Sequence, residues 1–222
     1  MSKGFFVTGT DTGIGKTTIS LGLIAALQNV GYKVCAMKPI ASGCEIINGE
    51  LRNDDALQLI KACKQDLNYK QINPYAFKPA IAPHIAAEQA GIEIDITIIC
   101  KLANKHKANN DYTIIEGAGG WQVPLNKTET VENLAIALNL PVILVVGLRL
   151  GCINHALLTR KAIQDSGLVL AGWVANHYNK NIHNAKEIIN AINQHIKSPH
   201  IATIGYMENV APNLDILTLT EN

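Results

Sequence analysis

A glycine-rich stretch near the amino terminus, FVTGTDTGIGKTT at residues 6–18, has the residue types of a phosphate-binding loop. The usual pattern is G-x-x-x-x-G-K-[ST], and here Gly9 stands one position early, so the loop is one residue longer. Backbone N–H groups of such a loop, with the dipole of the following helix, hold phosphate oxygens. Lys16 would then reach the β- and γ-phosphates, and the Thr17 hydroxyl would ligate Mg²⁺. The alternative is an ordinary strand-to-helix turn that needs glycines for tightness.

Carboxylates elsewhere in the chain could complete a metal site, because Mg²⁺ on a phosphate prefers hard oxygen ligands. Glu116 closes the apolar run YTIIE and precedes GAGG, where the backbone can approach a ligand closely. Asp54 and Asp55 in RNDD are the other candidates. For these two, a role as acids at a helix N-terminus, favoured by the helix dipole, is equally compatible with the sequence.

Two further segments bear on anion binding. Lys38 ends an apolar run and is followed by Pro39 and then Ser42, so its ammonium either lies in solvent or neutralises a developing negative charge. The segment GLRLGCINHA contains a predicted helix start, which either binds an anion or is simply an Asn-capped helix. The residues at that start are Gly151, Cys152, Ile153 and Asn154.

The elements that must position these residues alternate between apolar runs and amphipathic runs. The apolar runs lie at residues 4–9, 32–40, 112–120, 141–147, 168–177 and 200–207. The amphipathic runs lie at residues 16–31, 53–63, 130–139, 154–167 and 184–196. Continuously apolar strands separated by helices predict an α/β fold with a mostly parallel central sheet covered on both faces.

This fold would be a three-layer sandwich, and we expect one domain over residues 1–222. Residues 66–95 are the least regular part, with three prolines, and are predicted to form loops and a short helix over one end of the sheet. Ligands of such sheets bind at the carboxyl ends of the strands. The polar and glycine-rich stretches collect at those ends, which predicts one crevice there.

Composition limits the partners. The formal net charge is +1 without a long block of one sign, which argues against a broad surface for nucleic acid or an anionic membrane. The amino terminus has no secretory signal pattern, and the most apolar run, residues 140–148, is half the length of a membrane span. Five scattered cysteines form no metal-ligand pattern and predict reduced thiols in a cytoplasmic protein.

Seven motifs, in order and across almost the whole chain, resemble those of the dethiobiotin synthetase family. They are FVTGTDTGIGKT, KPIASG, LRNDDA, NPYAF…APH, EGAGGW, PVILVVGLRLGCINHALLT and AGWVAN. The resemblance implies a P-loop NTPase-like fold in which the longer loop is the normal form. It also implies an ATP-dependent cyclo-ligase of biotin biosynthesis that joins CO₂ to 7,8-diaminononanoate through a carbamate and a carbamic–phosphoric anhydride.

The same resemblance assigns roles to residues. Lys16 and Lys38 flank the reacting phosphate as catalytic groups, and three residues hold Mg²⁺: Thr17, Asp55 and Glu116. The nucleotide site comprises Gly13, Ile14, Gly15, Lys16, Thr17, Thr18, Asp55, Glu116, Gly117, Ala118, Gly119, Asn176, His177, Gly205, Tyr206 and Met207. The substrate site comprises Thr12, Lys38, Ser42 and, across a homodimer interface, Gly151, Cys152, Ile153 and Asn154.

Three positions depart from the family pattern. Gly13 stands where some members have Glu, His177 stands where Asp is common, and Gly205 replaces a proline near the base pocket. The last two weaken the inference of strict adenine selectivity, so the sequence leaves the triphosphate preference open.

Two other classes fit the same fold. A regulatory P-loop ATPase often carries an additional lysine where this chain has Asp11, and Lys38 on the next strand also argues against that class. An amidotransferase-type domain would need an ammonia source, and no glutamine-hydrolysing Cys/His signature stands out.

Overall fold

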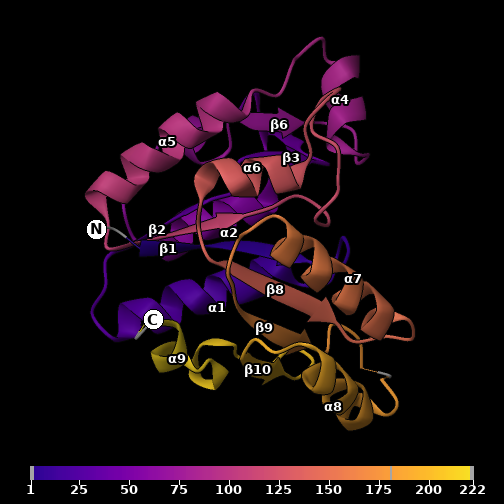
Figure 1. The fold of residues 1–222 in the computed structure, drawn as a ribbon. Helices are drawn as coiled ribbons and strands as arrows, with labels where there is room; N and C mark the ends of the chain where they lie inside the picture. Colours follow the sequence, from indigo (N-terminus) through magenta and orange to yellow (C-terminus); the bar gives the residue numbers. More distant parts are fainter. Residues whose placement is uncertain (1–2, 181, 221–222) are drawn as a thin grey trace.

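A computed structural model describes residues 3–180 and 182–220 of the chain and contains a central sheet of six strands (Figure 1). The strand order is β10-β9-β8-β1-β7-β2, and all neighbouring pairs are parallel. The strands are β1 (Lys3–Gly9), β2 (Val34–Met37), β7 (Tyr112–Glu116), β8 (Val142–Gly147), β9 (Leu170–Asn176) and β10 (His200–Ile204). The predicted parallel sheet is therefore confirmed.

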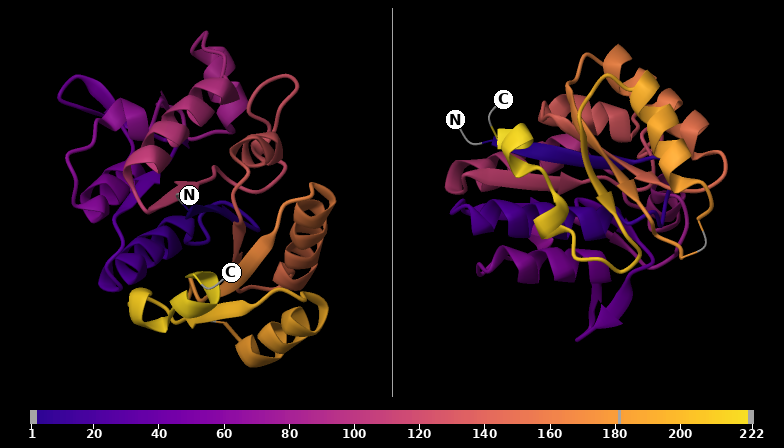
Figure 2. Two further views of the ribbon diagram at one scale, coloured as in Figure 1. Left: turned by 60° about the vertical axis from the view of Figure 1, so that its left-hand side comes forward. Right: turned by 90° about the horizontal axis from the view of Figure 1, so that it is seen from below.

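Helices cover both faces of this sheet, as Figure 2 shows in its right-hand view. One face carries α1 (Lys16–Asn29), α2 (Asp54–Cys63), the 3₁₀ turn η1 (Ala211–Asn213) and α9 (Ile216–Thr220). The other face carries α5 (Ile96–Asn109), α6 (Val131–Leu138), α7 (Cys152–Asp165) and α8 (Ala185–His195). This is the three-layer arrangement that the alternating runs predict.

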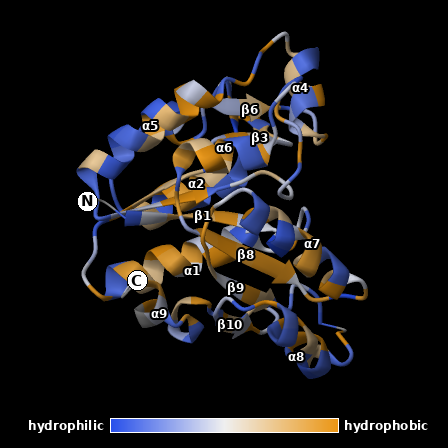
Figure 3. Cartoon of the chain, in the orientation of Figure 1, coloured by the Kyte–Doolittle hydropathy of each residue, from blue (hydrophilic) through white to orange (hydrophobic). Residues whose placement is uncertain are grey.

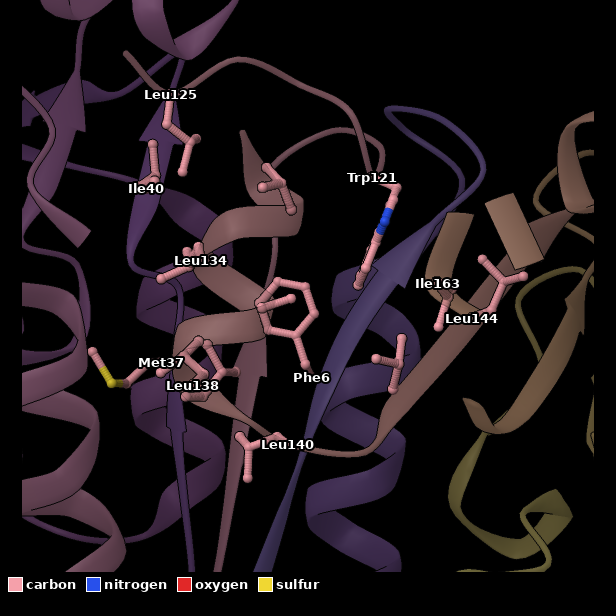
Figure 4. Close-up of a cluster of buried hydrophobic side chains, with 14 of the residues drawn as sticks. Phe6, Met37, Ile40, Trp121, Leu125, Leu134, Leu138, Leu140, Leu144 and Ile163 are labelled. Atoms are coloured by element: carbon pink, nitrogen blue, oxygen red, sulfur yellow. The ribbon is translucent and has the colours of Figure 1, made fainter. Parts of the chain in front are cut away.

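Two hydrophobic cores fill the spaces between the layers. Alternate residues of β1 point to opposite faces, so Phe5 and Val7 join one core and Phe6 joins the other. In the second core Phe6 packs near Leu134 and Leu138 of α6 (Figure 4). All six residues of β8 are buried, and the strand is apolar along its whole length (Figure 3). A strand covered on both faces has no solvent side, which explains the continuous apolar runs.

The segment around residues 66–95 contains more regular structure than the sequence predicted. It forms α3 (Tyr69–Ile72), β6 (Tyr75–Phe77) and α4 (Pro83–Gln89), and β6 pairs in parallel with β3 (Ile40–Ser42). The hairpin of β4 (Glu45–Ile47) and β5 (Glu50–Arg52) and the whole of α5 were also not predicted. The run at residues 32–40 is two strands rather than one, because Pro39 has no N–H and the Lys38 N–H donates to the Ile72 carbonyl instead of a strand.

Within the described residues, no helix combines the length and the apolar character that crossing a bilayer requires.

Gly22 on α1 lies against Val210, the residue before η1, and a substitution of Gly22 tests this packing. A Cβ added to Gly22 would lie 2.2 Å from Val210 Cγ1. Helix propensity alone would favour Gly22→Ala by about 1 kcal/mol, but we expect the clash to lower the free energy of unfolding by about 1–3 kcal/mol. Urea denaturation measures this. The added Cβ would also lie 2.4 Å from Val210 Cβ, so in a Val210→Gly background, which lacks both atoms, the loss should disappear, and an equal loss in both backgrounds would contradict this contact.

Candidate active site

The glycine-rich loop lies between the carboxyl end of β1 and the start of α1. Gly15 precedes the helix with φ +92°, a conformation that glycine adopts without strain. A Cβ on Gly15 would lie 2.2 Å from Asn176 Nδ2, which itself donates to the Ile14 carbonyl at 2.7 Å. Asn176 at the end of β9 therefore fixes the loop against a neighbouring strand.

Lys16 is the first residue of α1, and its side chain folds back across the loop. Its Nζ donates to the Asp11 carbonyl at 2.7 Å, and only 6% of the residue is exposed. Burial lowers the pKa of Lys16 to about 8, with a further contribution from the charge of Lys38. No carboxylate is in hydrogen-bond contact with this ammonium among the described residues, so it is poised to pair with an anionic ligand.

Lys38, Asp55, Glu116 and Thr17 form one connected polar cluster. Lys38 Nζ donates to Glu116 Oε1 at 2.5 Å and to Asp55 Oδ2 at 2.8 Å. The Thr17 hydroxyl donates to the same Glu116 Oε1 at 2.8 Å. Burial by itself lowers the pKa of Lys38, but the Glu116 and Asp55 carboxylates outweigh burial and raise it. The ammonium is therefore held in its charged form at the crevice.

The donor set of this cluster fits a magnesium ion. Glu116 is fully buried, and its Oε2 atom has no hydrogen-bond partner. One lysine opposes two carboxylates here, which leaves a net negative charge that a dication can balance. Among the described residues no group of three His, Cys, Asp or Glu side chains gathers. Two carboxylates and one hydroxyl are the ligand set of an ion that also needs phosphate oxygens and water.

A cavity of about 480 Å³ opens on the other side of Lys38. Its polar wall includes Thr12, Ser42 and Asp55, and the Ser42 hydroxyl is buried without a hydrogen-bond partner. Its apolar wall consists of Ile40, Ala41, Ala80, Ile81, Ala82, Pro83, Ala118 and Val123. A cavity with this division suits a ligand with a polar end and a hydrocarbon part.

The segment from Glu116 to Gly119 runs between the loop and the cavity. A Cβ on Gly119 would lie 3.4 Å from Thr12 Oγ1, and one on Gly117 would lie 3.1 Å from Phe6 Cζ. Gly119 also has φ +65°. Gly119 therefore allows the backbone to pass close to Thr12 of the glycine-rich loop, and Gly117 allows it to pass close to Phe6 of β1.

The residues at 151–154 lie at the start of α7, outside the lining of the cavity. Gly151 and Asn154 are exposed, whereas Cys152 is buried. Arg149 precedes this turn and pairs with Asp11 Oδ2 at 2.5 Å, which connects the turn to the glycine-rich loop. Arg149 was not predicted from the sequence, although an arginine beside a predicted strand end is a usable signal.

The residues predicted to lie near the base of the nucleotide follow the carboxyl ends of β9 and β10. The His177 N–H donates to the Ile204 carbonyl at 2.9 Å, which aligns the two strand ends. Beyond β10, the Gly205 N–H donates to Glu208 Oε2. Tyr206 and Met207 are exposed. Neither belongs to the polar cluster around Lys38.

The chain was compared with known proteins. The profile of the family described as "AAA domain" matches residues 3–213. A protein of Pseudomonas aeruginosa named "ATP-dependent dethiobiotin synthetase BioD" is 48% identical over 209 residues, covering 94% of this chain and 92% of that protein. A protein of Marinobacter nauticus with the same name is 47% identical, covering 92% of this chain and 88% of that one.

The chain belongs to the dethiobiotin synthetase family. It is therefore an enzyme, as the sequence motifs predicted.

Solved structures of low sequence identity share the fold alone. A ParA family ATPase from Chlorobium tepidum aligns with a TM-score of 0.57 at 15% identity, covering the whole chain and 94% of that structure. The septum site-determining protein MinD from Pyrococcus horikoshii aligns with a TM-score of 0.57 at 16% identity, covering the whole chain and 90% of that structure. The predicted P-loop NTPase-like fold is thus confirmed.

The buried charge of Lys16 should lower the free energy of unfolding of the ligand-free protein while it prepares the site for an anionic ligand. Since its pKa falls from about 10.5 unfolded to about 8 folded, the buried charge costs about 3 kcal/mol at pH 7. This cost is complete below pH 8 and is lost as the pH rises toward 10.5. Lys16→Met should therefore raise the free energy of unfolding of the ligand-free protein by up to about 3 kcal/mol at pH 7, and the gain should shrink by about half at pH 9.5.

Chemical denaturation at the two pH values measures this gain. Lys105→Met, on an exposed position of α5, is the control and should change the free energy of unfolding little at either pH. A Lys16→Met variant that is less stable than the wild type at pH 7 would contradict the assignment of an uncompensated buried charge.

Proposed function

We propose that this protein uses ATP and Mg²⁺ to convert 7,8-diaminononanoate and CO₂ into dethiobiotin, the penultimate step of biotin biosynthesis, with release of ADP and phosphate. Membership of the dethiobiotin synthetase family supports the overall reaction. The observation that carries the proposal is the position of Lys38, whose ammonium lies between Asp55 and Glu116 and also lines the cavity. Lys38 therefore lies between the glycine-rich loop, which would bind phosphate, and the cavity of about 480 Å³, which would bind the substrate.

The chemical problem is the approach of two anions. One amine of the substrate takes up CO₂ and loses a proton, which gives a carbamate. A carbamate oxygen then attacks the γ-phosphorus, the bond to ADP breaks, and a carbamic–phosphoric anhydride forms. The second amine attacks the carbamate carbon and loses a proton, and phosphate leaves with the oxygen that it received. No enzyme nucleophile takes part.

The residues of this chain would perform this by charge and position. Lys16 and the N–H groups of the glycine-rich loop would hold the β- and γ-phosphates, and Lys38 would face the carbamate. Both ammonium groups are already desolvated and fixed, so little reorganisation is needed when negative charge accumulates. Holding the carbamate in line with the phosphorus would supply much of the remaining rate acceleration.

Thr17, Asp55 and Glu116 are the residues that would hold Mg²⁺, and the unpartnered Glu116 Oε2 supports this assignment. When bound, the ion neutralises charge on the triphosphate oxygens. On the substrate side, the free Ser42 hydroxyl and Thr12 would bind the polar end of the diamine, and the wall around Ile81 and Val123 suits its methylene chain.

We further propose a homodimer in which residues 151–154 of one subunit bind the distal carboxylate of a substrate held by the other. These residues open the fourteen-residue helix α7, where the first backbone N–H groups and the positive end of the helix dipole favour an anion, although the Cys152 N–H already donates to the Arg149 carbonyl at 3.1 Å. Leu150 is fully exposed and Leu158 is 60% exposed, and two apolar side chains beside this turn favour burial against a second copy. Asn176, His177 and residues 205–207 would surround the base of the nucleotide.

A product assay with labelled bicarbonate tests the reaction. Purified protein is incubated with diaminononanoate, Mg²⁺, ATP and ¹⁸O-bicarbonate, and the products are examined by mass spectrometry. We expect a cyclic urea and one ¹⁸O atom in the released phosphate, because the carbamate oxygen leaves with it. If the rate of ATP hydrolysis does not change when the diamine is added, and the released phosphate is unlabelled, the result would favour a regulatory ATPase instead.

Replacement of Lys38 tests the charge-stabilising role. Lys38→Ala should lower kcat by about 10²–10³-fold, since an electrostatic group that faces the reacting anion is lost, while the dissociation constant for ADP changes by far less. Lys33→Ala is the matched control, because Lys33 is an exposed lysine just before the opposite end of β2. Near-normal turnover by Lys38→Ala would show that the proposed role is wrong. Circular dichroism establishes that the variant is folded.

A further inference from the structure

Two polar residues of the α3 segment, one buried and one partly buried, have no part in the reaction described so far. Tyr69 opens α3 and Asn73 follows its last residue, four positions later, so both side chains lie on the same side of the turn. Asn73 is only 2% exposed and Tyr69 is partly buried. Buried polar groups are costly unless they are hydrogen-bonded, so their partners are informative.

Asn73 holds the backbone of Lys38. Its Nδ2 donates to the Lys38 carbonyl at 2.6 Å, and the Lys38 N–H donates to the neighbouring Ile72 carbonyl at 3.1 Å. Both main-chain polar groups of Lys38 are therefore bonded to residues 72 and 73. No strand of the central sheet takes up these two groups, so the α3 segment determines where the Lys38 side chain begins.

Tyr69 connects this arrangement to the helix that carries Asp55. The Tyr69 hydroxyl donates to Asn73 Oδ1 at 2.8 Å and accepts the Asn53 N–H at 2.7 Å. Asn53 caps α2, because its Oδ1 accepts the Ala56 N–H at 3.2 Å, and Asp55 lies in the first turn of that helix. The continuous path of hydrogen bonds thus runs from the Lys38 carbonyl to the start of α2.

The ring and the charge state of Tyr69 suit this path. The Arg52 guanidinium lies 4.1 Å from the centre of the ring, which restrains it from the other side. Burial is the largest influence on the hydroxyl and raises the pKa of Tyr69. The hydroxyl therefore stays protonated and can donate and accept at once, as the two hydrogen bonds require.

We propose that Tyr69 and Asn73 are positioning residues that fix Lys38 and Asp55 relative to each other. Neither residue lines the cavity beside Lys38, so neither touches the substrate. The inference rests on the proposed function, because it assumes that turnover depends on the relative positions of Lys38 and Asp55. It goes beyond that function by giving Asn73, the first residue of the NPYAF motif, and Tyr69 before it a positioning role.

Tyr69→Phe is the variant that tests this role, because it removes only the hydroxyl. We expect kcat for cyclic urea formation to fall by roughly 10–100-fold, the size of effect that a small misplacement produces. The KM for ATP should rise by a smaller factor than kcat falls, because the glycine-rich loop is untouched and Asp55 is the one residue of the nucleotide site that the variant displaces. The melting temperature should fall by about 2–8 °C, as expected for the loss of two hydrogen bonds in a chain of this size.

Tyr75→Phe is a matched control within the same segment. The Tyr75 hydroxyl accepts the Asp95 N–H at 3.0 Å, and Asp95 caps α5 just as Asn53 caps α2. Its hydroxyl has no contact with Lys38 or Asp55. We therefore expect a similar fall in melting temperature with kcat unchanged. If both variants change kcat equally, or if Tyr69→Phe keeps the wild-type kcat, the positioning role is overturned.

Crystal structures of the wild type and Tyr69→Phe give an independent readout. In the wild type Lys38 Nζ should lie near the 2.8 Å distance from Asp55 Oδ2, and in the variant this contact should lengthen. An unchanged contact would overturn the proposal. If the wild type forms no cyclic urea, the proposed function fails, and the two structures alone then decide whether Tyr69 positions the pair.

Discussion

The structure depends on one buried charge, the Glu116 carboxylate on strand β7 of the central sheet. Its side chain is fully buried, and an unpaired carboxylate in such a place would be very costly. The sheet register provides the partner: β2 lies beside β7 with Met37 opposite Ile115, so Lys38 follows next to Glu116. The contact of 2.5 Å between them results directly from this register. Asp55 from α2 and Thr17 from α1 then join the same pair.

The two buried lysines of the site differ in their partners. Lys38 is neutralised by carboxylates, whereas Lys16 is bonded only to a backbone carbonyl in the described part of the chain. Burial and the charge of Lys38 outweigh the attraction of the Glu116, Asp11 and Asp55 carboxylates, so the buried Lys16 ammonium lowers stability, and its lowered pKa expresses that cost. An anionic ligand would remove the cost on binding. Ionisable groups whose pKa is strongly shifted by burial are common at binding and catalytic sites.

The same sheet occurs in proteins of other kinds, such as the ParA and MinD structures, at about 15% identity. The fold therefore does not identify the reaction. What distinguishes this chain is the set of residues at the strand ends, above all Lys38 after β2 and the cavity beside it. The irregular segment after α2 also matters here, because it supports the backbone of Lys38 from outside the central sheet.

The sequence by itself determined the alternation of strands and helices, the glycine-rich loop and its following helix, and Lys38 and Glu116 as polar residues after apolar runs. Local patterns suffice for these, because strand and helix periodicity and turn chemistry act over a few residues. For Asp55 the sequence left open a role as an acid at a helix N-terminus, and only the structure brought its carboxylate to Lys38 across seventeen residues. The order of the strands, the pairing of β3 with β6, and the hydrogen bonds of Asn73 were likewise decided by tertiary structure. They depend on contacts between distant segments, and no local pattern in the chain records which segments will meet.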